Sequence, residues 1–128
     1  MELVGIKFKV LDIRQAVEYL LKTGIFRIHE DYPGTGGAHT VMLRPIEGIA
    51  LVELQIEQPH ESRLADWKVT TDCELSLPCE DLETLTNIYS TLKDAGATVT
   101  DWFDRPWGGQ FWLKDLNGNH FMFSNTVG

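Results

Sequence analysis

The sequence predicts an α+β fold of two tandem βαβββ modules, whose strands form a curled mixed sheet around a concave cavity with the helices outside. Landmarks recur in the same order in both halves: a helix-capping Asp, a helix-ending Gly, a Gly-Gly pair and a turn Gly. Each half also shows a period-2 strand pattern, an amphipathic helix pattern and three more strand patterns. The period of about seventy residues is too long for a solenoid. Two helices cannot cover both faces of eight strands, so we expect the sheet to curl.

The first module covers about residues 1–57. It opens with a strand pattern over residues 3–10, in which apolar and other residues alternate. Asp12 then caps a helix with one apolar face, and Gly24 ends it. Three strand patterns follow, at residues 25–32, 38–43 and 49–56.

The second module covers about residues 72–126 and follows a linker at about residues 58–71. A strand pattern over residues 73–77 leads to a helix between Asp81 and Gly96. Three strand patterns follow at residues 98–104, 110–114 and 119–124. Asp115–Gly118 is typical of a hairpin turn with a positive φ at its glycine. The two modules together form a single domain.

Composition limits the classes of partner. The chain has 128 residues, 43% of them hydrophobic, and a formal net charge of −8. The acidic balance argues against nucleic-acid binding and suits a neutral or cationic small molecule better. Apolar runs are far too short for a membrane span and no signal peptide opens the chain, so we expect a cytoplasmic protein. Cys73 and Cys79 lack metal-ligand spacing and are expected to be reduced thiols.

The strand-to-helix junctions at residues 8–13 and 75–82, and the run at residues 105–119, carry a family resemblance. With them, the chain resembles the vicinal oxygen chelate superfamily, which includes glyoxalase I, extradiol dioxygenases, fosfomycin-resistance enzymes and bleomycin-resistance proteins. It looks closest to the metal-free bleomycin-resistance-like members. The resemblance covers essentially the whole chain and implies a homodimer that completes its cavities across a two-fold interface. It is specific for the fold and not for one function.

Enzymes of this superfamily place metal ligands on four inner strands. The resemblance puts those positions at Gly5, Glu53, Glu74 and Met122. Glycine has no side chain, and a thioether is a poor ligand for the divalent ions concerned. Two carboxylates without a histidine do not make the usual ligand set, although His120 lies two positions from one expected ligand. We therefore expect no metal cofactor, and keep a divalent ion at Glu53, Glu74 and His120 as the alternative.

Aromatic residues are concentrated near the C-terminal end of the chain. Trp102, Trp107 and Trp112 are our candidates to line a ligand site, because flat aromatic and cationic compounds stack on tryptophan. Alternation cannot place all the neighbouring rings on one side of a strand, so about half should be packing residues. Met122 and Lys7 complete this part of the candidate ligand site.

Three carboxylates alternate onto the predicted inner face. Glu53, Glu57 and Glu74 would form an acidic wall, unless they pair with Lys7 and Lys9 across the sheet. If they share a dry cavity, Glu53 or Glu74 could act as a general base.

These observations predict a small-molecule-binding protein that binds or sequesters an aromatic or cationic compound without a metal. One alternative is a divalent-metal-dependent lyase, isomerase or dioxygenase-like enzyme acting on a small oxygenated substrate. Another is a ligand-sensing or structural module without chemistry.

Overall fold

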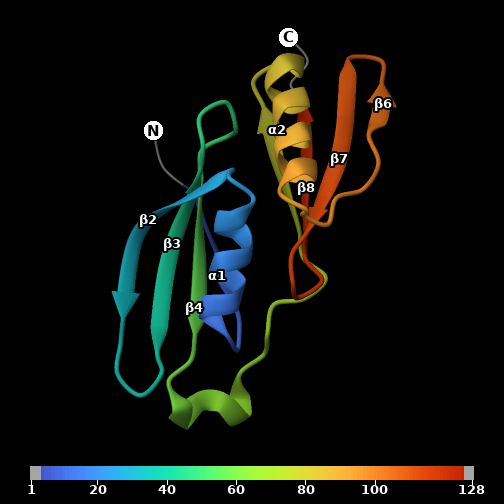
Figure 1. The fold of residues 1–128 in the computed structure, drawn as a ribbon. Helices are drawn as coiled ribbons and strands as arrows, with labels where there is room; N and C mark the ends of the chain where they lie inside the picture. The colour runs from blue at the N-terminus through green and yellow to red at the C-terminus, as the bar shows by residue number, and fades with distance from the viewer. Residues whose placement is uncertain (1–3, 126–128) are drawn as a thin grey trace.

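A computed structural model describes residues 4–125 of the chain, which form two βαβββ modules. Figure 1 shows the modules side by side, each with its helix against one face of its own sheet. The first module contains β1 (Val4–Lys9), α1 (Ile13–Lys22), β2 (Phe26–Pro33), β3 (His39–Pro45) and β4 (Val52–Gln58). The second contains β5 (Glu74–Cys79), α2 (Leu82–Asp94), β6 (Phe103–Arg105), β7 (Gly108–Lys114) and β8 (His120–Asn125). The two predicted tandem modules are confirmed.

Each module forms a four-stranded mixed sheet with equivalent topology. The strand order is β1-β4-β3-β2 in the first sheet and β5-β8-β7-β6 in the second. The first and last strands of each module pair in parallel, and the remaining pairs are antiparallel. Each sheet therefore has a helix-covered face and, opposite it, a face that we call the helix-free face.

Both helices begin and end as predicted. The Oδ1 atoms of Asp12 and Asp81 accept hydrogen bonds from the backbone N–H groups of Gln15 (3.1 Å) and Thr84 (2.7 Å). These bonds satisfy donors that a helix start leaves unpaired. Gly24 follows the end of α1 with φ +78°, a conformation that favours glycine.

The core joins the two modules through their helix-covered faces. Phe8 of β1 and Phe121 of β8 meet edge to face with ring centroids 5.8 Å apart, and both rings are buried. The hydroxyl of Tyr19 on α1 donates to the carbonyl oxygen of Lys114 at 2.5 Å. Ile49 also forms an isolated β-bridge with Cys79. This packing joins the modules on their helix-covered side and leaves the helix-free faces accessible.

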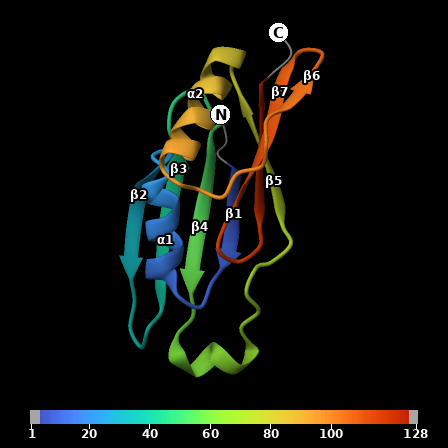
Figure 2. The ribbon, with the colours of Figure 1, turned by 45° about the vertical axis from the view of Figure 1, so that its right-hand side comes forward.

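The connecting segment and one strand differ from the sequence prediction. Residues 61–66 of the linker form a 3₁₀-helix (Figure 2). The strand expected over residues 98–104 is reduced to the three residues of β6, with Val99 in an isolated bridge. Leu82, the first residue of α2, is 45% exposed. Neither described helix could span a membrane.

Candidate functional site

The helix-free face of the first sheet is formed by the side chains that alternate with its core residues. On β1 and β4, the predicted inner residues Lys7, Glu53 and Glu57 lie on this face, between buried residues that point to α1. Lys7 Nζ lies 3.0 Å from Glu57 Oε2. Glu53 Oε2 lies 3.1 Å from both Nε and Nη2 of Arg44 on β3. Both candidate carboxylates of this sheet are therefore paired with cations.

This pairing decides between the two sequence interpretations of the acidic residues. The lysine partner expected across the sheet is confirmed for Glu57. Lys9 instead lies over the ring of Trp67, with its Nζ 5.0 Å from the ring centroid. The partner of Glu53 is Arg44, which the sequence analysis did not select. The ionic hydrogen bond from Nε and the ion-pair contact of Nη2 hold Glu53 in a fixed position.

The helix-free face of the second sheet holds the third candidate carboxylate. Glu74 Oε1 accepts a 2.6 Å hydrogen bond from the indole Nε1 of Trp112 on β7. In register, Glu74 lies opposite His120, and Trp112 lies opposite Met122. Trp112 is half-buried on this face.

An arginine between two aromatic rings occupies the other end of the same face. The guanidinium carbon of Arg105 lies 5.5 Å from the ring centroid of Phe103 and 5.7 Å from that of Trp107. Arg105 Nε donates to Gln110 Oε1 at 2.9 Å. Phe103 is 57% exposed and Trp107 is 45% exposed. Together Phe103, Arg105, Trp107 and Gln110 form the group that we call the Arg105 cluster.

A buried asparagine supports the turn that carries this cluster. Asn125 Oδ1 accepts the backbone N–H of Gly109, and its Nδ2 donates to the carbonyl oxygen of Trp107, each at 3.0 Å. These contacts connect the end of β8 to the β6–β7 turn and fix the backbone beside Arg105. The sequence analysis quoted this turn as part of a family motif, but it did not assign a role to Arg105, Gln110 or Asn125.

Trp102 corrects the predicted ligand set. Its ring packs edge to face on Tyr89 of α2 and stacks on Phe111, with centroids 5.5 Å and 6.2 Å away. These contacts place it on the helix-covered face of the second sheet. Gly109 lies directly below the ring, where the Cβ of any other residue would overlap it. Trp102 is therefore a packing residue, and Trp107 and Trp112 remain as tryptophans of the candidate site.

The four positions that the family resemblance gives as metal ligands do not fit a metal ion. Gly5 and Glu53 are register partners in the first sheet, whereas Glu74 and Met122 lie in the second. Gly5 offers no donor, Met122 offers only a thioether, and the two carboxylates hold Arg44 and Trp112. A thioether is a poor match for hard or borderline divalent ions. Across residues 4–125, no three His, Cys, Asp or Glu side chains are placed to bind one ion.

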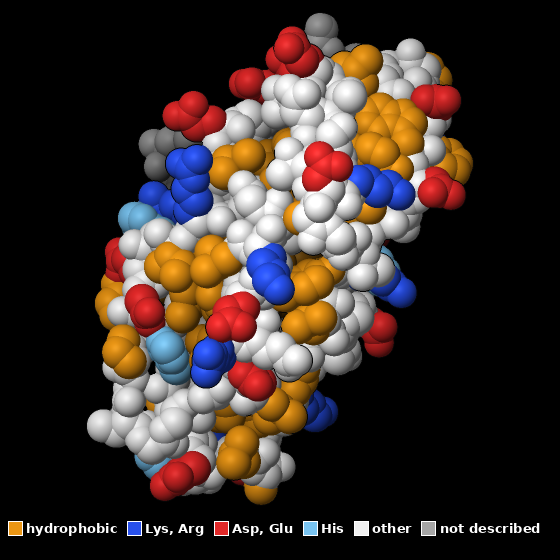
Figure 3. Space-filling model, viewed as in Figure 1, with side chains coloured by type: hydrophobic (Ala, Val, Ile, Leu, Met, Phe, Trp, Pro, Cys, Tyr) orange, Lys and Arg blue, Asp and Glu red, His pale blue; other side chains and the backbone are white. Residues whose placement is uncertain are grey.

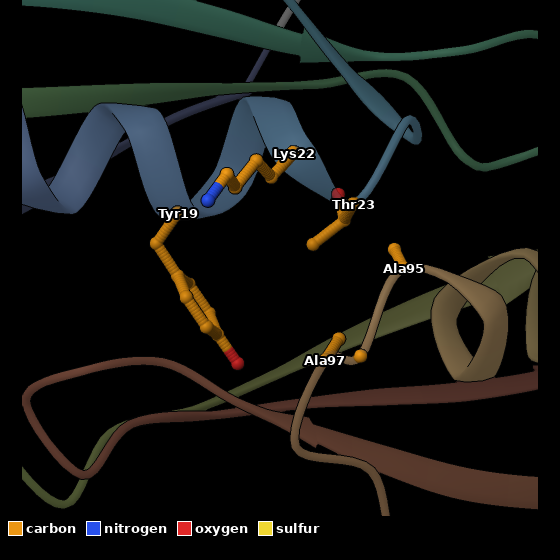
Figure 4. Close-up of a pocket in the computed structure, with 6 residues that line it drawn as sticks. Tyr19, Lys22, Thr23, Ala95 and Ala97 are labelled. Atoms are coloured by element: carbon orange, nitrogen blue, oxygen red, sulfur yellow. The ribbon is translucent and has the colours of Figure 1, made fainter.

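Two cavities lie away from the helix-free faces. One of about 180 Å³ lies at the module junction, between the end of α1 and the loop after α2 (Figure 4). Its lining includes Tyr19 and Lys22 and otherwise consists of small residues. A larger cavity of about 340 Å³ opens between α1, β2 and β3. On the side shown in Figure 3, hydrophobic side chains form separate patches between charged ones.

Comparison with solved structures shows the fold. The antibiotic-binding protein TnmS3 from Streptomyces sp. CB03234 superposes with a TM-score of 0.71 at 20% identity, over 98% of this chain and 95% of that one. A glyoxalase/bleomycin resistance protein/dioxygenase superfamily member from Sphaerobacter thermophilus DSM 20745 gives 0.69 at 22% identity, over 98% of both chains. Lactoylglutathione lyase from Agrobacterium tumefaciens gives 0.71 at 13% identity, over 98% and 94%.

The comparisons confirm the fold that the resemblance implied. This chain has the fold of the glyoxalase/bleomycin resistance protein/dioxygenase superfamily. No protein-family model matches the sequence, and no curated protein matches it. The fold includes both binding proteins and enzymes, so the function has to be argued from the side chains on the helix-free faces.

Proposed function

We propose that this chain binds a small aromatic compound on its helix-free faces, without a metal ion, as a binding or sequestering protein. The observation that carries the proposal is exposed aromatic surface: Phe103 lies on the same face as Trp112, and Trp107 lies beside Arg105 of that face. Exposed rings on one surface favour stacking of a flat ligand, which contributes about 0.5–1.5 kcal/mol per ring pair. The antibiotic-binding protein TnmS3, which shares the fold, provides a precedent.

The residues at the four expected metal-ligand positions argue for metal independence. An ion at Glu53 would have to displace the guanidinium of Arg44, and an ion at Glu74 would have to displace the indole N–H of Trp112. Gly5 and Met122 supply no compensating oxygen or nitrogen ligand. The alternative, a divalent-metal-dependent lyase, isomerase or dioxygenase-like enzyme, therefore has less support from these residues.

Elemental analysis and thermal melting test metal independence. We expect the purified protein to contain less than one tenth of an equivalent of Ni, Zn, Fe or Mn, and its melting temperature to stay constant when EDTA is added. A stoichiometric ion together with a lower melting temperature in EDTA would refute metal independence and favour the enzyme. Linkage gives the reason, because a ligand that binds only the folded state raises stability.

Tryptophan fluorescence tests ligand binding. Titration with a panel of polycyclic aromatic drugs should quench the emission, and Trp107→Ala should weaken binding about two- to tenfold through loss of one stacking contact. Trp102→Phe is the matched control, because it changes a tryptophan on the helix-covered face. A ligand at a hundred times its Kd should stabilise the fold by about 2.7 kcal/mol. If no compound in the panel quenches the emission or raises the melting temperature, the proposal fails.

We further propose a homodimer. Within residues 4–125, β1 pairs only with β4, and β5 pairs with one other strand, β8, so each has a side without a strand partner. Unpaired edges are favourable places for strands of a second copy. A two-fold arrangement would bring two helix-free faces together around one cavity. Sedimentation equilibrium should give twice the chain mass, and a monomer at micromolar concentration would contradict this proposal.

The two free cysteines are consistent with the cytoplasmic location expected from the sequence. That location remains a prediction.

A further inference from the structure

Charge is distributed unevenly between the helix-free faces and the rest of the molecule. Residues 4–125 contain all eleven basic residues and eighteen of the nineteen acidic ones, Glu2 being the exception. Six of the basic residues alternate onto the helix-free faces: Lys7, Lys9, Arg27, Arg44, Arg105 and Lys114. Only four of the acidic residues do so: Glu30, Glu53, Glu57 and Glu74. These faces are therefore net positive in a chain with a net charge of −8.

Each of the four carboxylates already has a partner in the chain. Arg44 and Lys7 pair with Glu53 and Glu57, and the indole N–H of Trp112 binds Glu74. Glu30 lies 3.4 Å from the imidazole Nε2 of His29. A cationic ligand would have to compete with these groups, and it would also meet the excess positive charge.

Arg105 differs in its contacts from Arg44, which also lies on a helix-free face. Arg44 is bound to a carboxylate, whereas Arg105 has no ion pair with any described acidic residue. Among residues 4–125, Arg105 makes its hydrogen bond through Nε, to Gln110 Oε1. The remaining N–H groups of a guanidinium form a planar pair of donors that matches a carboxylate. The rings of Phe103 and Trp107 restrict the position of this pair of donors.

We propose that the ligand is an aromatic acid, whose anionic group is bound by Arg105 and whose ring stacks on the neighbouring aromatic side chains. This proposal rests on the proposed function, because it assigns the charge of a ligand at the same site. Trp107 adjoins Arg105, and Trp112 lies two residues beyond Gln110 on β7, about 7 Å along the strand. A fused ring system substituted with one carboxylate would span this distance. Gln110 and Asn125 are positioning residues that hold the guanidinium and its turn.

Three matched probes test the charge of the ligand: an anthraquinone carboxylate, the corresponding carboxamide, and the corresponding trimethylammonium derivative. Affinities are measured by tryptophan quenching at pH 7 on the full-length protein. We expect the carboxylate to bind about tenfold more tightly than the carboxamide, equivalent to about 1.4 kcal/mol. The trimethylammonium compound should bind most weakly. The preference for the carboxylate should decrease as salt is raised, because the site is open to solvent.

Variants assign the preference to one side chain. Arg105→Gln should reduce the carboxylate-to-carboxamide ratio to less than twofold, and Arg105→Lys, which keeps the charge but loses the planar donors, should give an intermediate ratio. Lys93→Gln is the matched control: it removes the same charge from α2, where Lys93 Nζ lies 5.4 Å from the ring centroid of Tyr89. Equal melting temperatures of Arg105→Gln and wild type would show that the fold is unchanged.

The outcomes separate this proposal from the proposed function. If all three probes bind equally, or the trimethylammonium compound binds best, the proposal of an acidic ligand is refuted, whereas the proposal of aromatic binding stands. An unchanged ratio in Arg105→Gln would refute the role of Arg105. If none of the probes binds, while drugs of the wider panel do bind, the acid is again refuted. If no aromatic compound of either set binds, the proposed function fails, and the acid fails with it.

Discussion

Replacement of Asn119 by alanine should destabilise the fold by several kcal/mol, far more than replacement of Asn117 in the same turn. Its side chain is 1% exposed and makes three hydrogen bonds. Oδ1 accepts the backbone N–H of Cys73 at 3.0 Å, and Nδ2 donates to the Thr70 carbonyl oxygen and to Asp115 Oδ2, each at 2.8 Å. The side-chain amide of Asn119 therefore connects the linker between the modules to the turn and to the start of β8.

The expected loss follows from these three bonds. Two neutral hydrogen bonds at about 1 kcal/mol each and one to a carboxylate at about 2 kcal/mol give about 4 kcal/mol. Unfolding entropy of about 2.1 cal/mol/K per residue over 128 residues converts this loss into a melting temperature lower by about 15 °C. Urea unfolding, followed by circular dichroism, measures the free energy of unfolding directly.

Asn117→Ala is the matched control, because Asn117 lies in the same turn and its interaction with Asp115 uses only its backbone N–H, at 2.8 Å. We expect it to cost less than about 1 kcal/mol, as is usual for a substitution away from such networks. Equal losses in Asn117→Ala and Asn119→Ala would refute the reasoning.

Asn119→Asp tests the direction in which stability changes with pH. The new carboxylate would face Asp115 Oδ2, so burial and like charge would raise its folded-state pKa, and stability should increase as the pH falls through that value.

Three further predictions concern packing and titration. Gly109→Ala should lower the free energy of unfolding by about 1–3 kcal/mol and alter the near-UV circular dichroism, because the new methyl group would displace the ring of Trp102. Cys79 should resist iodoacetamide at pH 8 in the folded protein, because its pKa is raised to about 12, mainly by burial. Half-buried Cys73 should react first, and mass spectrometry of the digested protein locates the label. The bond from the Thr84 N–H lowers the pKa of Asp81 below its ordinary value of 3.8, so the stabilisation by the charged cap is present above that pH and lost as the pH falls through the folded-state pKa. In urea unfolding, wild type should therefore be more stable than Asp81→Asn at neutral pH, and the difference should disappear under acidic conditions.

Local chemistry explains why most of the fold could be predicted. The caps at Asp12 and Asp81 and the positive φ of Gly24 and Gly118 depend on residues within one helical turn or one hairpin. Strand faces follow from period-2 alternation wherever one face is buried, because a slip by one residue would expose the core. These signals require no knowledge of distant contacts.

The environment of Trp102 could not be predicted in this way. The stretch of residues 98–105 does not alternate regularly, and within it only the three residues of β6 form a strand. The side on which the ring lies depends on α2, which supplies Tyr89, and on Gly109, which leaves room for the ring. Both contacts come from elements that meet only in the folded chain. A tryptophan count near a motif therefore indicates an aromatic region and not the face that each ring occupies.

The charge of the site shows a second limit of sequence analysis, because net charge describes the whole chain and not one surface. The value of −8 suited a neutral or cationic ligand, yet the acidic residues lie mainly outside the helix-free faces. Glu53 is paired with Arg44 only because the β3–β4 register brings the strands together, with Leu43 opposite Leu54. A register shift of two residues would keep both side chains on the same face and still separate the pair. The sign of the surface that a ligand meets is thus set by strand register, which alternation alone does not determine.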